Sequence, residues 1–372
     1  MSKYDIAAII WPSYTGDEPR SRIFWPEGFG EWESVKKMTN KGYDGSRWPR
    51  RPLWGYVNEA NSDVMEMQIN TAVRHGVNTF IYDWYWYDNR PFLENCLNDG
   101  FLKAENNKDM KFYLMWANHD ATYLWDIRNS QDTKTIVWRG AVTEQIFDNI
   151  CDRTIEKYFS KENYYCIDGC PVYMIFDLQN FVDSFDNVDK CKEGVERFRQ
   201  KTVSSGFNGL HLQLAFFSDY KGRIKKPDSD DTFTMKELME YIGFDSFTNY
   251  NWACVNINID DEYSVVTDSY MGVCDEYYKW KTPFYPNITI GWDNNIRFKE
   301  FQPGVIKNNT PQEFEKACGR IRIHTDKLLK DGKISTPLIT VNSWNEWTET
   351  SYLEPDDLYG TGYLEAIRRV FG

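Results

Sequence analysis

Short apolar segments that end in polar or aromatic residues recur along the chain, and helical patterns separate several of them. Strands that alternate with helices form a parallel sheet, because parallel neighbours need a crossover connection. Eight such units predict a closed (β/α)8 barrel. The eight segments are residues 5–14, 77–86, 111–120, 171–180, 210–219, 243–252, 283–294 and 335–346. Helical patterns occupy 143–160, 187–204 and 311–331, and a further helix begins near Ser62.

The 372-residue length fits one such barrel with long insertions. A barrel of this kind needs about 250 residues, and we expect the excess in loops that follow strands, chiefly 12–60 and 253–282. The sequence contains no internal repeat, low-complexity tract or Pro/Gly-rich linker, so it predicts a single catalytic domain over 1–372. The alternative fold is an open doubly wound sheet. No Gly-rich phosphate loop follows the first strand, which disfavours it.

The chain is rich in aromatic residues, with 15 Trp and 24 Tyr, and many of these rings stand next to carboxylates and amides. Most single rings are expected in the core. Rings beside carboxylates and amides also hold sugars, because C–H faces stack on the ring while hydroxyls bond to the polar groups. The formal net charge of −13 disfavours nucleic acid and anionic membrane surfaces as partners.

The eight cysteines and four histidines are dispersed, and no spacing is typical of a metal site. We therefore expect no metal, no cofactor and reduced thiols. No apolar stretch approaches the ~20 residues that span a bilayer, and the N-terminus shows no signal-peptide pattern. The sequence predicts a cytoplasmic protein, or a secreted one whose signal peptide is missing here. The sequence does not indicate which oligomeric state the protein adopts.

The ends of the predicted strands carry the candidate substrate-binding residues, since active sites of (β/α)8 barrels lie at the carboxyl ends of the strands. Each position alone is unremarkable. Together they predict a mouth that binds sugar. The candidates are Trp11, Tyr14, Asp83, Tyr85, Asn118, His119, Tyr250, Trp292, Asp293, Asn345 and Trp347.

Glu346 and Glu349 follow the eighth strand and are three residues apart, a spacing that places both side chains on one face of a helix or turn. Two adjacent carboxyl groups in a poorly solvated site separate in pKa, so that one acts as a base and the other donates a proton. Glycosidic cleavage requires that division. The alternative is that either glutamate caps a helix or pairs with an arginine.

The segment "NEWTETSYLEPD", with "YG" and "YLEAI" after it, resembles the end of the WbsX-like family, often described as glycosyltransferases. It also resembles the related glycoside hydrolase family 99 of endo-α-mannosidases and endo-α-mannanases. The segments "GFGEW" (28–32), "RRPLWGYVN" (50–58), "QINTAVRHGVNTFIYDWYWY" (68–87), "MWANHD" (115–120) and "GWDNN" (291–295) extend the likeness over most of the chain.

This resemblance implies a (β/α)8 fold and action on α-linked sugars with retention of configuration. It implies that Glu346 deprotonates the sugar 2-hydroxyl to give a 1,2-anhydro intermediate, and that Glu349 protonates the leaving oxygen and later activates water. Such chemistry needs a mannose- or rhamnose-configured sugar. Thr350 departs from the family, which has glycine there, and threonine disfavours positive φ. We therefore expect the turn after Glu349 to differ.

Three functions fit these observations. The first is a retaining glycoside hydrolase acting on an α-linked polysaccharide or oligosaccharide. The second is a glycosyltransferase, although no Asp-x-Asp motif at a strand end or nucleotide-phosphate cradle is evident. The third is a non-catalytic carbohydrate-binding barrel, which would need neither glutamate.

Overall fold

The computed structural model describes residues 3–16, 18–38, 50–217 and 223–372. Its strands are β1 (Asp5–Ile10), β2 (Thr79–Tyr87), β3 (Arg90–Phe92), β4 (Lys111–Trp116), β5 (Ala121–Thr122), β6 (Ile136–Trp138), β7 (Cys166–Ile167), β8 (Cys170–Ile175), β9 (His211–Ala215), β10 (Ser246–Thr248), β11 (Asn287–Thr289), β12 (Leu338–Asn342), β13 (Asn345–Glu346) and β14 (Ser351–Tyr352). Its α-helices are α1 (Trp32–Lys37), α2 (Ser62–Arg74), α3 (Glu144–Thr154), α4 (Leu178–Val182), α5 (Val188–Ser204), α6 (Met235–Ile242), α7 (Tyr263–Tyr277), α8 (Pro311–Lys330) and α9 (Gly362–Phe371).

Eight parallel strands form a nearly closed ring in which neighbours in space are neighbours along the chain. β1 pairs with both β2 and β12, and β4, β8, β9 and β10 follow β2 in order. β11 pairs with β12, and a parallel bridge between Phe247 and Phe284 connects β10 to the segment before β11. The prediction of a (β/α)8 barrel is confirmed, and each predicted strand segment contributes one strand of the ring.

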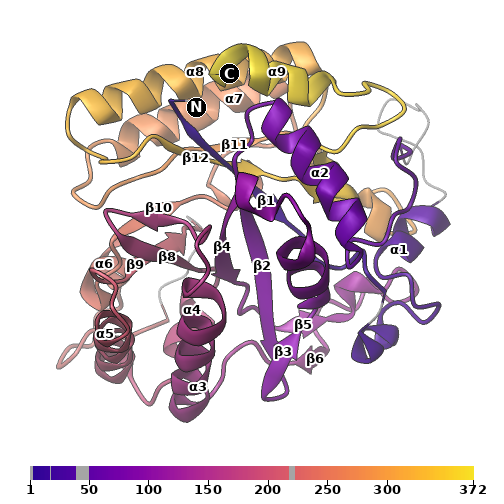
Figure 1. The fold of residues 1–372 in the computed structure, drawn as a ribbon. Helices are drawn as coiled ribbons and strands as arrows, with labels where there is room; N and C mark the ends of the chain where they lie inside the picture. Colours follow the sequence, from indigo (N-terminus) through magenta and orange to yellow (C-terminus); the bar gives the residue numbers. More distant parts are fainter. Residues whose placement is uncertain (1–2, 17, 39–49, 218–222) are drawn as a thin grey trace.

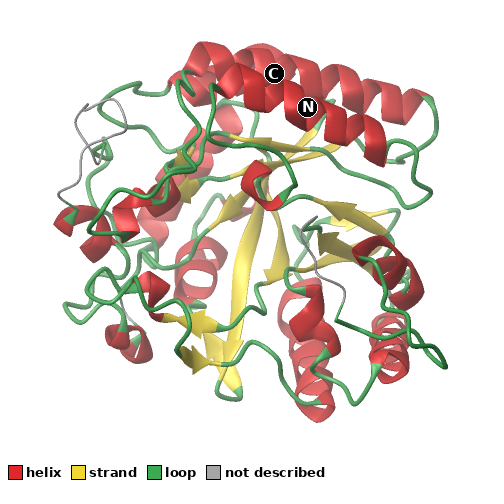
Figure 2. Ribbon diagram, turned by 180° about the vertical axis from the view of Figure 1, so that it is seen from behind, coloured by secondary structure: helices red, strands yellow, loops and turns green. Residues whose placement is uncertain are grey.

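The helices cover the outside of the ring. Figure 1 shows α7, α8 and α9 together along one side, and α3, α4, α5 and α6 on another. Figure 2 shows the strands enclosed by helices when the molecule is seen from behind. Strands covered on both faces are almost wholly apolar, which explains why β1 and β4 read as continuous hydrophobic runs.

Local signals in the sequence set several helix ends. The Asn61 side chain accepts a hydrogen bond from the Asp63 N–H and caps α2, and Thr310 caps α8, where Pro311 occupies the first turn. Thr234 and Glu237 form a reciprocal capping box at α6. These caps explain why helices expected near Ser62 and over 311–331 begin where they do.

One expected loop is largely helical. The segment 253–282 was predicted as a long insertion, but it contains the 15-residue helix α7. The buried face of α7 is made mainly of tyrosines, including Tyr263, Tyr270 and Tyr277, which the apolar pattern does not register. The other predicted insertion, 12–60, contains α1 between β1 and α2. Its residues 39–49 and Asp17 lie outside the described part of the chain.

A second hydrophobic cluster packs between the loops at the carboxyl ends of the strands. It contains Trp11, Tyr14, Phe24, Trp25, Trp32, Tyr85, Tyr87, Trp125, Trp347 and Tyr352 among others. Much of the aromatic content therefore stabilises loops. All eight cysteines are free. In the described ranges, no helix combines the length and apolarity that crossing a bilayer requires.

Candidate active site

Glu346 and Glu349 lie where the chain leaves β12. Glu346 pairs in the short strand β13, and Glu349 ends the 3₁₀ turn Trp347–Glu349. Their residues are only 2% and 7% exposed. The Ser343 Oγ accepts the Glu346 N–H at 2.9 Å, and the Thr348 Oγ1 donates to the Glu346 Oε1 at 2.8 Å. The Glu346 side chain is therefore held by its own segment.

Arg297 joins these two glutamates to a third. It ends the 3₁₀ turn Asn295–Arg297 after β11 and is 5% exposed. Its Nη1 donates to the Glu349 Oε1 at 2.9 Å, and its Nη2 donates to the Glu346 Oε1 at 3.3 Å. Its Nε donates to the Glu31 Oε1 at 3.3 Å. One buried cation thus serves three buried carboxyl groups.

Burial and crowding displace the pKa values of this cluster. Burial raises the pKa of Glu346 well above its usual range, and repulsion from Glu349 adds to the effect. Burial also raises the pKa of Glu349, while Arg297 opposes the shift by charge and by hydrogen bonding. Because Arg297 makes its shorter contact with Glu349, it favours the ionised form of Glu349 more than that of Glu346.

Four buried polar atoms, on three side chains in this region, have no hydrogen-bond partner. They are Asp83 Oδ1, Glu349 Oε2 and both polar atoms of the Asn342 side chain. Asp83 lies close enough to Glu349 for repulsion to raise its pKa further above the level that burial sets. Asn342 points into the barrel, as does Thr340 two residues earlier, whose Oγ1 bonds to the Thr248 Oγ1 across the ring at 2.8 Å. Sugar hydroxyls would satisfy such atoms.

Five of the predicted residues surround the carboxyl groups with rings. The Trp11 Nε1 donates to the Glu31 Oε2 at 2.5 Å, and the Tyr14 hydroxyl accepts the Trp347 N–H at 3.2 Å. Tyr85 contacts Trp11 and His119 edge-on. Burial lowers the pKa of His119, which therefore stays neutral near pH 7. Burial raises the pKa of Tyr250, and the charges of Asp83, Glu349 and Glu346 raise it further.

Other predicted binding residues use their side chains inside the protein. Asn118 bonds to the Asp177 backbone through both polar atoms, at 2.8 and 2.7 Å. The Asp293 Oδ1 accepts from the Asn295 backbone and side chain. The Asn345 and Trp347 side chains bond to other buried groups, and Trp292 packs on the main core. These side chains therefore already have partners within the protein, and their predicted role in substrate binding stays a prediction.

The residues predicted from the strand ends did not include Glu31 and Arg297. Glu31 directly precedes α1, far beyond the end of β1, and Arg297 lies in the 3₁₀ turn after β11; 266 residues separate them along the chain. Glu31 stands in "GFGEW", and Arg297 stands two residues after "GWDNN". Glu31 lies inside one of the segments that resemble the family, and Arg297 lies just after another. A search for charged residues in or beside those segments would therefore have found both.

Thr350 adopts the conformation in which glycine is favoured. Its φ is 55°, in the left-handed region. Its Oγ1 donates to the Asp293 carbonyl at 2.9 Å, and the Asp293 N–H donates to the Glu349 carbonyl at 2.8 Å. Threonine therefore adopts here a positive φ that it ordinarily disfavours, and the hydroxyl bond stabilises a backbone conformation that otherwise costs about 1–2 kcal/mol.

Replacing Thr350 by valine should lower the free energy of unfolding by about 1–3 kcal/mol, because the buried Asp293 carbonyl loses its donor. Replacing Thr350 by glycine should be nearly neutral, since relief of backbone strain offsets the lost bond. Urea unfolding of both variants measures this difference. A valine variant as stable as the wild type would show that the hydroxyl bond does not hold the turn.

A second buried carboxyl pair, Glu59 and Glu354, lies on the other side of the same segment. The Gln68 Nε2 donates to the Glu59 Oε1 at 3.1 Å and to the Glu354 Oε1 at 2.8 Å. The Asn345 Nδ2 donates to both oxygens of Glu59, at 3.1 and 2.9 Å. Burial raises the pKa of Glu59 to about 7. Burial and repulsion from Glu59 raise the pKa of Glu354.

The Glu59 shift predicts that the protein is less stable at pH 8 than at pH 5.5. A raised pKa means that the folded state holds the proton more tightly, so the stability is present below the unfolded pKa and is lost as pH rises through about 7. The shift corresponds to about 3 kcal/mol. Glu59→Gln should narrow the difference in melting temperature between the two pH values.

The matched control is Glu94→Gln. Glu94 is partly buried, but its bonds to Arg153 and Tyr158 lower its pKa, so its contribution is lost at acid pH instead. Glu94→Gln should leave the difference in melting temperature between pH 5.5 and pH 8 as large as in the wild type. If both variants reduced the difference in melting temperature equally, Glu59 would not be the source of the pH dependence.

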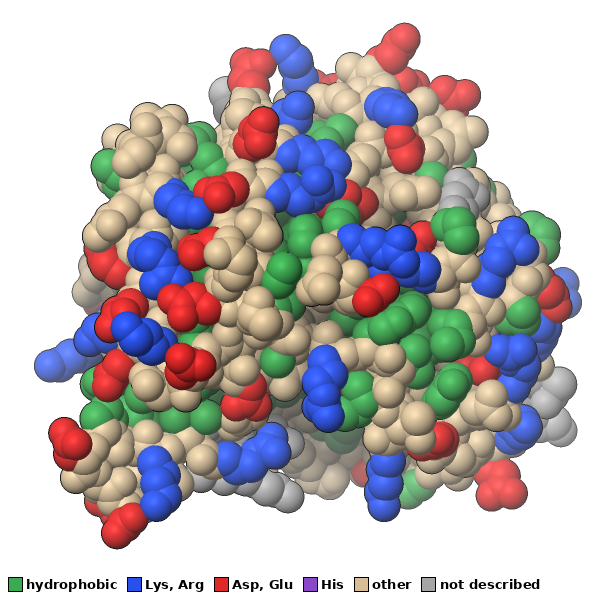
Figure 3. Space-filling view, turned by 90° about the horizontal axis from the view of Figure 1, so that it is seen from below, with side chains coloured by type: hydrophobic (Ala, Val, Ile, Leu, Met, Phe, Trp, Pro, Cys, Tyr) green, Lys and Arg blue, Asp and Glu red, His purple; other side chains and the backbone are tan. Residues whose placement is uncertain are grey.

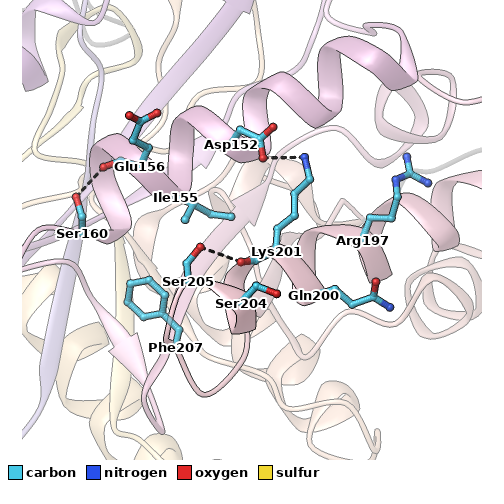
Figure 4. A pocket seen from close by; sticks show the side chains of 10 residues that line it. All are labelled: Asp152, Ile155, Glu156, Ser160, Arg197, Gln200, Lys201, Ser204, Ser205 and Phe207. Atoms are coloured by element: carbon cyan, nitrogen blue, oxygen red, sulfur yellow. Dashed lines mark hydrogen bonds and ion pairs between the residues drawn. The ribbon is translucent and has the colours of Figure 1, made fainter.

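The other described parts of the surface offer weaker candidates for a functional site. Figure 3 shows lysine and arginine interspersed with acidic side chains around apolar patches on the face seen from below. A hollow of about 820 Å³ lies between the α3 end and α5, lined in part by Asp152, Lys201 and Phe207 (Figure 4). Asp152 and Lys201 pair with each other there at 2.7 Å. Among the described residues, no three His, Cys, Asp or Glu side chains are placed to ligate a metal ion.

Comparison with known families and chains gives a consistent result. Residues 7–367 match the family described as "Glycosyltransferase WbsX". The uncharacterised protein WxcX of Xanthomonas campestris pv. campestris (strain B100) is 22% identical over 367 residues, which cover 94% of this chain and 47% of WxcX. The chain therefore spans about half the length of this relative.

Solved structures share the fold. The GH99 endo-alpha-mannosidase from Bacteroides thetaiotaomicron aligns with a TM-score of 0.60 at 11% identity, over 98% of this chain and 95% of that one. A glycoside hydrolase-like protein aligns with a TM-score of 0.58 at 15% identity, over 100% and 94% of the two chains. At these identities the likeness establishes the barrel architecture.

Proposed function

Because the chain belongs to the WbsX glycosyltransferase family, we propose that it is a carbohydrate-active enzyme, and specifically a retaining glycoside hydrolase. Its substrate is an α-linked mannose- or rhamnose-configured sugar in a polysaccharide or oligosaccharide. The observation that carries the proposal is the buried pair Glu346 and Glu349, which share Arg297 at the carboxyl end of β12. The likeness to an endo-alpha-mannosidase fold supports it.

The proposed reaction uses the substrate 2-hydroxyl as the nucleophile. Glu346 takes the proton of this hydroxyl, and the oxygen attacks the anomeric carbon while Glu349 protonates the leaving oxygen. In the second half, Glu349 takes a proton from water, which opens the 1,2-anhydro ring, and Glu346 returns its proton to the 2-oxygen. Two inversions give net retention. Each carboxyl group ends in its starting state, so the cycle is balanced.

Burial and the contacts of Arg297 favour a proton on Glu346 over one on Glu349. Glu346 has the more strongly raised pKa, and the guanidinium of Arg297 lies closer to Glu349. The proposed cycle needs the proton on Glu349. Substrate binding therefore has to reverse the order, and a hydroxyl that donates to Glu346 favours its ionised form.

A glycosyltransferase is the second candidate, because the family description names that activity. A sugar-nucleotide donor would need a cradle for its phosphates or a metal ion. The carboxyl-rich character of the Glu31, Glu346 and Glu349 cluster opposes a diphosphate at this position, since one arginine serves all three. We therefore rank hydrolysis first.

A hydrolysis screen of the wild type against Glu346→Gln and Glu349→Gln tests the proposal. The substrates are α-mannans, rhamnose-containing glycans and bacterial surface polysaccharides, with products followed by mass. Release by the wild type alone supports a hydrolase and identifies its substrate class. A rise in melting temperature with UDP-, GDP- or TDP-sugar, without hydrolysis, favours the transferase. Glycan binding that survives both substitutions, without any turnover, favours a binding protein.

An aryl α-glycoside of the released sugar separates the two glutamate roles. When the phenol is acidic enough to leave without a proton, Glu349→Gln should recover the first step, seen as a burst of phenolate release, although the water attack that Glu349 assists stays slow; Glu346→Gln should show no burst. Recovery by the Glu346 variant instead would exchange the roles.

A further inference from the structure

Three residues that flank Glu346 place their side-chain N–H groups on one buried unit. The Trp347 Nε1 donates to the Glu354 Oε2 at 2.6 Å, and the Asn345 Nδ2 donates to Glu59. The Trp344 Nε1 donates to the Gln68 Oε1 at 3.1 Å. Gln68 in turn donates to both carboxyl groups. The unit of Glu59, Gln68 and Glu354 therefore contacts the chain on both sides of Glu346.

Every group in this unit is buried, and the donors to its two carboxyl groups are neutral. Glu59 and Gln68 are 0% exposed, and Glu354 is 3% exposed. Placing two acidic side chains side by side in the interior is unfavourable unless they are well bonded. Apolar residues of similar volume often pack at least as stably, so stability alone is a weak reason for the pair.

The unit also connects the segment to separate parts of the barrel. Gln68 belongs to α2, and Glu59 lies in the loop before it, where the Glu59 N–H donates to the Tyr14 carbonyl. The Asn345 side chain exchanges two hydrogen bonds with the Trp11 backbone at the end of β1, at 2.8 and 2.9 Å. These bonds fix the segment relative to β1 and α2.

We propose that Glu59, Gln68 and Glu354 are positioning residues that set the direction of the Glu346 carboxyl group. The inference rests on the proposed function of Glu346, but it makes a structural claim of its own. The unit fixes Trp344, Asn345 and Trp347, and these residues determine where the backbone presents Glu346 to Arg297. A misplacement of about 1 Å at a reacting group lowers turnover by about 100-fold.

The test compares Gln68→Met and Glu354→Gln with Glu94→Gln. Methionine matches the length of glutamine and removes its donors and acceptor. Glu94 is the matched control, because it is a partly buried glutamate that also accepts an indole N–H, from Trp84 at 2.8 Å, outside the Glu59, Gln68 and Glu354 unit. Melting temperature measures the structural loss in each variant, and crystal structures report the distance from Arg297 Nη2 to the Glu346 Oε1, which is 3.3 Å here.

We expect Gln68→Met and Glu354→Gln to shift the Glu346 carboxyl group by about 1 Å and to lower kcat by about 100-fold, with KM changed only a few-fold. Glu94→Gln should lose a similar amount of thermal stability and keep kcat. The proposal would be overturned if the Glu346 side chain had not moved in Gln68→Met and Glu354→Gln. It would also be overturned if kcat fell in proportion to melting temperature in all three variants, Glu94→Gln included. If the wild type cleaves no glycan, the hydrolase proposal fails, and the position of Glu346 in the variants alone decides the present one.

Discussion

Glu346→Gln is expected to reduce glycan cleavage by about 10²–10⁴-fold, the range for loss of one acid–base group. Glutamine keeps the size of the side chain and can still accept from Thr348, whose Oγ1 lies 2.8 Å from the Glu346 Oε1. It cannot take the proton of the sugar 2-hydroxyl. The loss should therefore appear in kcat, with substrate affinity largely retained. Initial rates over a range of substrate concentrations measure both parameters.

Stability separates this effect from misfolding. Burial raises the pKa of Glu346, so the neutral glutamine resembles the protonated form that the unliganded site favours. The variant should melt at the wild-type temperature or above it. Full activity in a folded Glu346→Gln protein would remove this residue from the chemistry. If Glu346→Gln lost both its activity and its folding, Glu94→Gln would serve as the control, because it is destabilised at another place. Retained cleavage by Glu94→Gln would show that destabilisation alone does not abolish activity.

Arg297→Met is expected to lower the free energy of unfolding by about 3–5 kcal/mol at pH 8, the usual consequence of removing one partner of a buried ion pair. Glu31, Glu346 and Glu349 would then lie together in the interior without a cation. Their response is to take up protons, so the loss should be much smaller at pH 5 than at pH 8. Urea unfolding at the two pH values measures the difference.

Arg297→Lys is the companion variant. It keeps the charge, but one ammonium group cannot make the three directed contacts that Nη1, Nη2 and Nε make. We expect an intermediate stability and a weaker dependence on pH than in Arg297→Met. A methionine variant with wild-type stability at pH 8 would show that the three carboxyl groups are already neutral, and that Arg297 does not hold Glu349 in its ionised form.

The barrel was predictable because each strand of the ring is covered on both faces. Segments such as 6–10 and 112–116 are therefore continuous apolar runs, and the crossover helices α2 and α8 carry clear caps at Asn61 and Thr310. Helix α7 was missed for the opposite reason. Four of the six buried residues of this helix are Tyr or Thr, and hydroxyls such as those of Tyr263 and Thr267 bond to backbone carbonyls, so its burial leaves a weak apolar pattern.

The candidate site was predictable in part. Glu346 and Glu349 adjoin a strand end, and the rule for barrels points to that position. Arg297 and Glu31 meet them only because β11 and β12 are neighbours and the loop after β1 folds back, which no local pattern records. Asn118 and Asp293 stand at strand ends as well, but their side chains bond to nearby backbone. Strand-end position alone does not separate a ligand-binding group from a turn-forming one.

The pairing of β1 with β12 joins the first strand of the chain to the last. Trp11 at the end of β1 and Asn345 after β12 bond across 334 residues. The carboxyl groups and their arginine thus reach one another only after the whole ring has formed. Activity becomes a reporter of ring closure: on dilution from urea, turnover should recover with the slowest folding phase, behind the far-ultraviolet signal of the helices.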